Sequence, residues 1–109
     1  MQKPRLGPSG HELNGLVELF RLLSDKTRLH ILLLLAGGER NVTSLCEELA
    51  LTQPTASHHL GLLRMRNLIS NRRDGRKVLY GLSGHVVLDK RNGLKIGAQS
   101  FNVMIAERD

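Results

Sequence analysis

Apolar residues recur at helical spacing along the first part of the chain. Residues 12–25 carry an apolar stripe along one helical face, with Gly15 inside it: Leu13, Leu16, Val17, Phe20 and Leu23. Residues 25–39 form a helical segment that is apolar nearly all round from Leu29 to Ala36, which predicts a central helix capped by Ser24 or Asp25 and ended by two glycines. Two packed helices are therefore expected to open the chain.

Two shorter helical segments follow. Residues 43–50 begin with Ser44 and Glu47 at the spacing of a capping box, and Thr43 is an alternative cap. After a tight turn, residues 52–66 predict a helix whose first residue is the cap and whose first turn holds a proline. The spacing of this helix turns four residues inward: Ala56, His59, Leu60 and Leu63.

The periodicity then changes from helix to strand. Residues 68–82 hold two extended runs separated by Asp74-Gly75, a pair typical of a type I′ hairpin turn. The positive charge of this hairpin gathers around its turn, in four residues: Arg72, Arg73, Arg76 and Lys77.

The last segment, residues 84–109, fits two structures. A helix would contain Asn92, Gly93 and Gly97, which are poor helix formers, although Leu94, Ala98, Phe101 and Ile105 do share a helical face. Strands would be separated by an Asn92-Gly93 turn, and a bulge or second turn near residue 99 would move the apolar positions from even to odd. We favour strands, and we expect the segment to serve packing or dimerisation.

Length and composition set the scale of the molecule. A chain of 109 residues builds one modest core, so we expect a flexible arm over residues 1–10, one domain over residues 11–83 and the extension over residues 84–109. The sequence has no apolar run long enough for a membrane span and no secretory signal. Its single cysteine, Cys46, excludes an internal disulfide and fits a reducing cytoplasm.

Charge and element order together indicate a function. The net charge is +6 and the sequence pI about 10.3, which favours an anionic partner such as nucleic acid. Two helices joined by a tight turn and followed by a basic hairpin predict an α+β fold, the winged helix-turn-helix. The first turns of the second helix would meet base edges in the DNA major groove through four residues: Gln53, Thr55, Ser57 and His58. The hairpin arginines and Lys77 would bind phosphates or the minor groove.

Three motifs in order resemble the ArsR family of bacterial winged-helix repressors. They are LFRLLSDKTRLHILLLL, TQPTASHHLGLLR and DGRKVLYGL, and the resemblance covers residues 12–82. It implies a homodimer that binds a pseudo-palindromic double-stranded operator and represses transcription. It also places DNA-facing residues at the same positions of the second helix and hairpin, and it sets Asn67 where relatives commonly have glycine.

The departures from this family concern metals. Thiol-sensing members carry Cys-Val-Cys where this chain reads Asn41-Val42-Thr43. Other members bind metals through Asp and His ligands on a C-terminal dimer helix, where this tail offers only His85 and Asp89 before its glycines. His58 and His59 are adjacent, so they point about 100° apart on a helix and are ill placed to share one ion. We therefore expect no metal site and name no cofactor, and the sequence does not identify an inducer.

The remaining expectations concern assembly and alternatives. The first helix has more apolar surface than one small domain needs, so we predict a homodimer through Leu13, Leu16, Val17 and Phe20. Lys26 and Arg28 begin a helix, an unfavourable place for cations that points to a phosphate neighbour or to an ion pair with a glutamate of the first helix. The competing function is a winged-helix module that binds protein or RNA. No arrangement of residues supports an enzyme.

Overall fold

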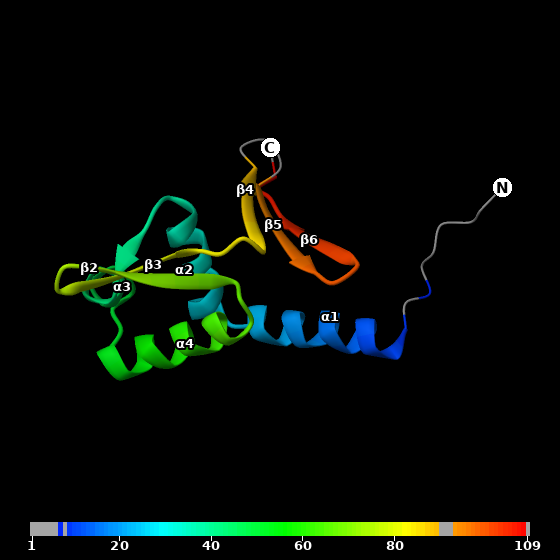
Figure 1. Ribbon diagram of the computed structural model, residues 1–109, viewed down its shortest axis with the longest axis horizontal. Coiled ribbons are helices and arrows are strands. Elements are labelled where there is room, and N and C mark those ends of the chain that lie inside the picture. The colour runs from blue at the N-terminus through cyan, green and yellow to red at the C-terminus, as the bar shows by residue number, and fades with distance from the viewer. Residues whose placement is uncertain (1–6, 8, 90–92, 109) are drawn as a thin grey trace.

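Helices and a hairpin form the body of the protein, and a second small sheet stands on it (Figure 1). The computed structural model describes residue 7, residues 9–89 and residues 93–108. The helices are α1 (Gly10–Leu23), α2 (Lys26–Ala36), α3 (Val42–Leu49) and α4 (Gln53–Met65). The strands are β1 (Arg40–Asn41), β2 (Ile69–Asp74), β3 (Lys77–Leu82), β4 (Val86–Asp89), β5 (Gly93–Ala98) and β6 (Phe101–Ile105).

Side-chain caps fix where the helices begin. Asp25 and Thr52 cap α2 and α4, as expected, by accepting from backbone N–H groups three residues on. Helix α3 differs: Asn41 Oδ1 accepts from the N–H of Ser44 at 2.7 Å, so α3 begins at Val42 and the predicted capping box is wrong. Asn is a strong cap, and here it lies ahead of both predicted caps. Ser9 caps α1, so the helix includes Gly10 of the predicted arm, most of which lies outside the described residues.

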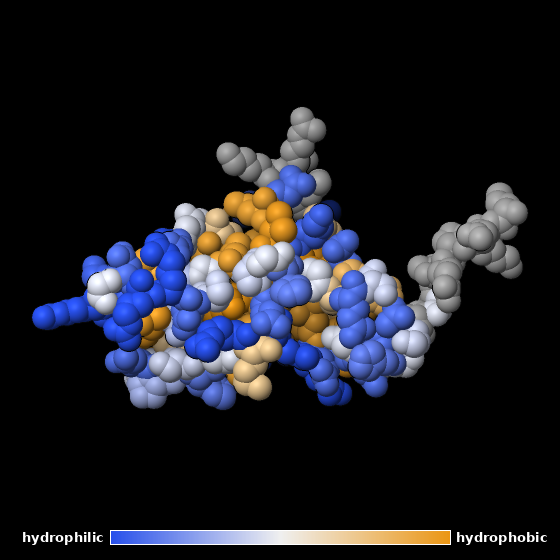
Figure 2. Space-filling model, viewed as in Figure 1, coloured by the Kyte–Doolittle hydropathy of each residue, from blue (hydrophilic) through white to orange (hydrophobic). Residues whose placement is uncertain are grey.

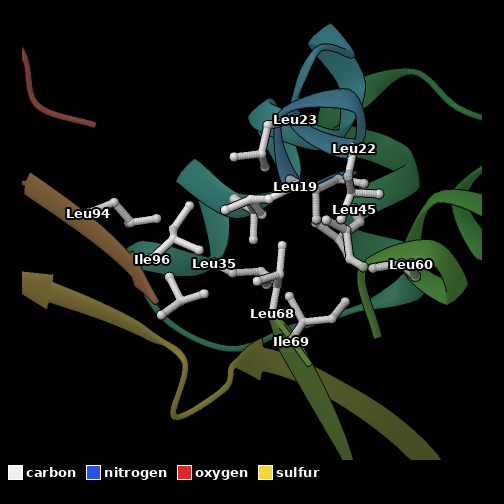
Figure 3. Packing of buried hydrophobic residues seen from close by; sticks show 14 residues of the cluster. Leu19, Leu22, Leu23, Leu35, Leu45, Leu60, Leu68, Ile69, Leu94 and Ile96 are labelled. Atoms are coloured by element: carbon white, nitrogen blue, oxygen red, sulfur yellow. The ribbon is translucent and has the colours of Figure 1, made fainter. Parts of the chain in front are cut away.

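One aliphatic core joins all the helices to both sheets (Figure 3). Ile31, Leu32 and Leu35 of α2 belong to the same buried cluster as Leu60 of α4 and Leu45 of α3. Helix α2 is less enclosed than its sequence predicts: His30 and Leu33 face solvent, and Leu33 is 51% exposed. The four inward positions predicted for α4 are confirmed, since three are buried and His59 is half-buried.

Strands β1, β3 and β2 form an antiparallel sheet, in which β2 and β3 are the wing. Asp74 pairs with Lys77, so the two turn residues are Gly75 and Arg76 rather than the predicted Asp74-Gly75. Gly75 has φ 64°, and Arg76 has no positive φ. Positive φ at the first turn residue alone is typical of a type II′ turn, which also matches strand twist. The type I′ prediction is therefore wrong by one residue.

The C-terminal segment forms strands, as favoured from the sequence. Strands β4, β5 and β6 make a second antiparallel sheet, and Ala98 pairs with Phe101 across a turn at Gln99-Ser100. This turn, rather than a bulge, moves the apolar residues from even to odd positions. Gly15 of α1 lies under the turn, where an added Cβ would be 3.4 Å from Gln99 Nε2. Asn92 of the other predicted turn lies outside the described residues.

Candidate nucleic-acid interface

The first turn of α4 is exposed, and the side chain of Thr52 caps it. Thr52 Oγ1 accepts from the backbone N–H of Thr55 at 3.4 Å and donates to the Thr55 hydroxyl at 2.9 Å. Ala56 is fully buried beneath this turn. Gln53, Thr55, Ser57 and His58, the residues predicted to meet base edges, are all exposed on α4. The Thr55 hydroxyl already accepts a hydrogen bond from Thr52. Gln53, Ser57 and His58 are therefore more available than Thr55 to contact a partner.

The outward face of α4 contains two residues that the sequence analysis missed. Gly61 is exposed one turn beyond Ser57, and a Cβ added there would meet no atom within 4 Å. Glycine in a helix lowers the free energy of unfolding by about 1 kcal/mol relative to alanine. A glycine on an exposed helix face is therefore a signal from which the sequence could have identified Gly61 as a position where a partner approaches closely. Arg64 is exposed one turn further on and adds positive charge to the helix.

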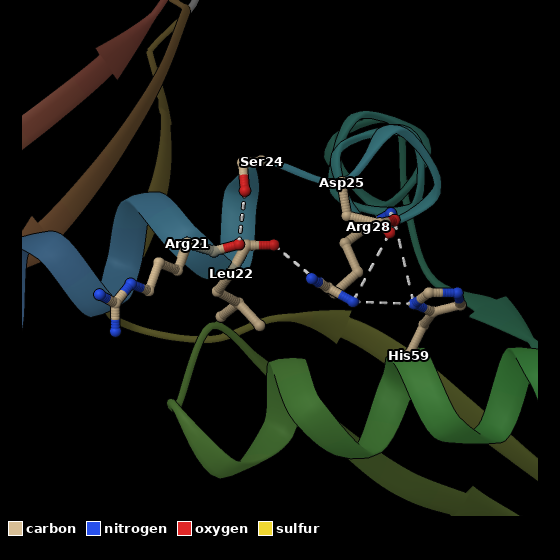
Figure 4. Close-up of polar contacts among 6 residues, drawn as sticks. All are labelled: Arg21, Leu22, Ser24, Asp25, Arg28 and His59. Atoms are coloured by element: carbon tan, nitrogen blue, oxygen red, sulfur yellow. Dashed lines mark hydrogen bonds and ion pairs between the residues drawn. The ribbon is translucent and has the colours of Figure 1, made fainter.

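A polar network fixes the angle at which α4 is presented (Figure 4). Arg28 Nε donates to the carbonyl of Leu22 at 2.7 Å, and its Nη1 lies 3.2 Å from His59 Nδ1. Because a guanidinium only donates, His59 accepts at Nδ1 and carries its proton on Nε2. Arg28 therefore joins the end of α1 to α4, and its ion pair is with Asp25 rather than with a glutamate of α1. His59 is therefore a half-buried packing residue that contacts Arg28, whereas its neighbour His58 is exposed on the outward face of α4.

Asp25 completes this network from the start of α2. Its Oδ1 accepts from the backbone N–H of Arg28 at 3.0 Å, and its Oδ2 lies 3.8 Å from Arg28 Nη1. The hydrogen bond from the backbone N–H of Arg28, with help from the charge of the Arg28 guanidinium, lowers the pKa of the Asp25 carboxyl below its ordinary value. A carboxylate at a helix N-terminus is also favourable to the helix dipole.

The wing carries its four basic residues on different faces. Successive strand residues point to opposite sides, so Arg72 and Arg73 cannot reach the same phosphate. Arg72 is engaged with Glu39 by two hydrogen bonds, of 2.9 Å and 2.8 Å. These bonds lower the pKa of Glu39 and raise that of Arg72. Arg76 and Lys77 lie at the exposed turn, so the wing tip holds cations better placed for a partner.

The wing tip and the start of α4 lie at the same end of the molecule (Figure 1). A groove of about 490 Å³ between them is lined by Gln53, Arg76 and Lys77, together with residues of α3 and the flanking strands: Asn41, Val42, Thr43, Ser44, Glu47 and Val78. Figure 2 shows that the surface at this end is predominantly hydrophilic. Of the residues predicted to contact DNA, Gln53 of α4 and Arg76 and Lys77 of the wing thus line the same groove. Arg72 is not part of its lining.

Metal-ligating side chains do not gather in the part of the chain that the structure describes. No three His, Cys, Asp or Glu residues there lie in positions that could hold one ion. Cys46 is a free thiol and is half-buried on α3. Among the described residues, no helix combines the length and the apolarity needed to cross a membrane.

A helix-turn-helix formed by α3 and α4, followed by the β2–β3 wing, defines a winged helix-turn-helix protein. Asn67, at the turn between α4 and the wing, has φ 60°, the left-handed conformation expected there. Residues 25–71 match the family described as "Bacterial regulatory protein, arsR family". The chain belongs to this family, and the resemblance drawn from its motifs is confirmed.

Known proteins similar to this chain are named as repressors. The arsenical resistance operon repressor of Escherichia coli K12 is 46% identical over 71 residues, which are 64% of this chain and 61% of that protein. This chain therefore spans about three fifths of that repressor's length. The transcriptional repressor SdpR of Bacillus subtilis 168 is 36% identical over 74 residues, which are 68% of this chain and 82% of SdpR.

A solved structure extends the similarity to the fold. It is described as the homodimeric winged helix-turn-helix DNA-binding domain of a possible ArsR-family transcriptional regulator from Mycobacterium bovis. It is 32% identical, with a TM-score of 0.62, and the match covers 72% of this chain and 75% of that one.

Proposed function

We propose that this protein is a sequence-specific DNA-binding transcriptional repressor that acts as a homodimer. The observation that carries the proposal is the convergence of Gln53 of α4 with Arg76 and Lys77 of the wing on one groove. Helix α4 is exposed along the face that would enter the major groove, and the wing tip would lie on the adjacent backbone. The names of the relatives support repression as the outcome.

Base reading is assigned to the exposed residues of α4. Gln53, Ser57 and His58 would contact base edges, and Thr55 would contribute with the part of its hydroxyl that the cap leaves available. Arg73, Arg76 and Lys77 would bind phosphates, and we assign Arg72 mainly to holding the wing in place. The function is regulatory rather than catalytic, and a DNA-binding repressor acts in the bacterial cytoplasm.

Dimerisation is assigned to the apolar stripe of α1. Leu13, Val17 and Phe20 are 49%, 40% and 51% exposed, and the half-buried Leu16 adjoins them. Residues three and four apart share a helix face, so these side chains form one patch. A two-fold axis through this patch would set two copies of α4 about 34–36 Å apart, one turn of DNA.

Selection of duplexes from a random pool tests this function. The protein should enrich an inverted repeat, and alanine at Gln53 or Ser57 should relax the preference at one position of each half-site. We further propose that zinc, cadmium and arsenite leave the complex intact, because Asn41 and Thr43 stand where thiol-sensing relatives carry cysteines. Enrichment of no sequence would contradict the function, and release by these metals would contradict the assignment of no metal site.

A further inference from the structure

A mostly apolar groove of about 350 Å³ lies between α1 and α4, outside the proposed DNA surface. Its volume is within the range of pockets that hold small organic ligands. Three apolar side chains form its lining: Leu22, Leu62 and Met65. Four charged residues also line it: Glu18, Arg21, Arg28 and Arg66.

The apolar part of this groove includes an unusual methionine. Met65 is 79% exposed, more than any other large hydrophobic residue that the structure describes. It lies beside the half-buried Leu62, and Leu22 points toward α4 from the opposite side (Figure 4). A flexible methionine at the edge of a concave surface is well suited to contact an aliphatic ligand.

The charges around the groove favour an anion. Three arginines and only one carboxylate, that of Glu18, line the groove, and Glu18 accepts a hydrogen bond from Arg66. Arg28 is only 15% exposed and is held by Leu22 and His59. Arg66 is 42% exposed and Glu18 is 54% exposed, so a carboxylate from solution can compete with Glu18 for the Arg66 guanidinium.

We propose that this groove binds a small organic monocarboxylate with an aliphatic body. The carboxylate displaces Glu18 from Arg66, and the aliphatic body covers Leu22, Leu62 and Met65. Binding adds one negative charge beside the end of α4, which carries Arg64 and Arg66, and so weakens attraction to DNA phosphates. This last consequence rests on the proposed function, whereas ligand binding does not.

Octanoate is the probe for the binding step. Titration into the full chain, followed by the methyl NMR signals of Met65 and Leu62, should give saturable shifts. Glu18→Gln should tighten binding severalfold, because the competing carboxylate is removed. Met65→Glu should weaken it by about tenfold or more, because a carboxylate then occupies the groove. Arg66→Gln, a second variant, should weaken binding through loss of the guanidinium.

Matched controls separate this site from general surface binding. Met104→Glu makes the same exchange at an exposed methionine of β6 and should leave octanoate binding unchanged. Octanol and octylammonium keep the aliphatic body without the carboxylate and should bind much more weakly. Equal binding of these probes, or no saturable shift with octanoate, overturns the proposal. A change in oligomeric mass on Met65→Glu without octanoate binding would assign the groove to a second copy and also overturn it.

The DNA step is measured separately with the selected duplex at fixed ionic strength. Octanoate should lower DNA affinity for the wild type and have no effect on Met65→Glu. Binding of octanoate with unchanged DNA affinity overturns the regulatory step alone. If the chain selects no duplex, the proposed function fails, while the octanoate titration still decides whether the groove is a ligand site.

Discussion

Arg72 of β2 is joined to Glu39 by two hydrogen bonds, from Nε to Oε2 at 2.9 Å and from Nη2 to Oε1 at 2.8 Å. Glu39 precedes β1, and β3 lies between β1 and β2, so the pair crosses the sheet. Gly81 of β3 leaves room for it, since a Cβ there would lie 3.3 Å from Glu39 Cγ. The arginine thus braces the wing against the body of the protein.

This pairing predicts unequal roles for the wing arginines. Arg76→Ala should weaken specific and nonspecific DNA about equally and reduce the slope of log affinity against log salt by about one per subunit. Arg72→Ala should change the slope less, because its charge is already paired. Anisotropy titrations at several salt concentrations measure both. Glu39→Gln is the control, since it frees Arg72 and should steepen the slope. A larger effect of Arg72→Ala than of Arg76→Ala would contradict these roles.

The cap at Asp25 predicts a stability effect that depends on pH. Asp25→Ala should lower the free energy of unfolding by about 0.5–2 kcal/mol at neutral pH, through loss of the cap. Asp25→Asn keeps a capping side chain and should cost less. Because the folded protein lowers the pKa of Asp25, its charge stabilises the fold above the ordinary carboxyl pKa.

That stabilisation is lost as the pH falls through the lowered pKa, so the difference between wild type and Asp25→Asn should shrink in acid. Urea denaturation at neutral pH and at a pH below the ordinary carboxyl pKa compares the free energies of unfolding of the two proteins. A difference that stays constant, or grows, at low pH would show that the charge of Asp25 contributes nothing to folding.

Two substitutions at Gly61 test stability and DNA binding independently. Gly61→Ala should raise the free energy of unfolding by about 0.5–1 kcal/mol, because alanine is the better helix former and the position is open. Gly61→Gln adds a bulky neutral side chain to the outward face and should weaken operator binding by about tenfold or more. Retained affinity in a folded Gly61→Gln variant would show that the middle of α4 does not approach DNA closely.

The stripe on α1 predicts the oligomeric state. The protein should sediment at twice the 12.1 kDa of one chain at micromolar concentration, and Phe20→Glu should shift it to a monomer. Leu33→Glu is the matched control, because Phe20 and Leu33 are each 51% exposed and only Phe20 belongs to the stripe. A monomeric wild type, or a Phe20→Glu variant that stays dimeric, would exclude this interface.

Local periodicity accounts for what the sequence could predict. Apolar spacing located all four helices, and the cost of Gly93 and Gly97 in a helix correctly favoured strands in the tail. Thr52 was identified as a cap because its side chain acts on a backbone group three residues away. The exposure of Thr55 and His58 on α4 followed from the same spacing.

Contacts between residues far apart in the chain could not be predicted from the sequence. Glu39 and Arg72 are 33 residues apart, and Arg28 and His59 are 31 apart, so each pair depends on how elements pack. The misplaced turn at Gly75 has a local cause, because Asp74 fits both a strand end and a turn. The cap at Asn41 was missed because Asn41, Thr43 and Ser44 compete over a few residues.

The central claim is that α4 and the wing bind DNA as one sequence-specific surface. Its most direct measurement is an anisotropy titration of the selected duplex, and of the same duplex with one half-site scrambled, across a range of salt. We predict that the scrambled duplex binds more weakly by about a thousandfold or more and that affinity for both falls steeply with salt. Equal affinity for the two duplexes, or an affinity that does not change with salt, would contradict the account.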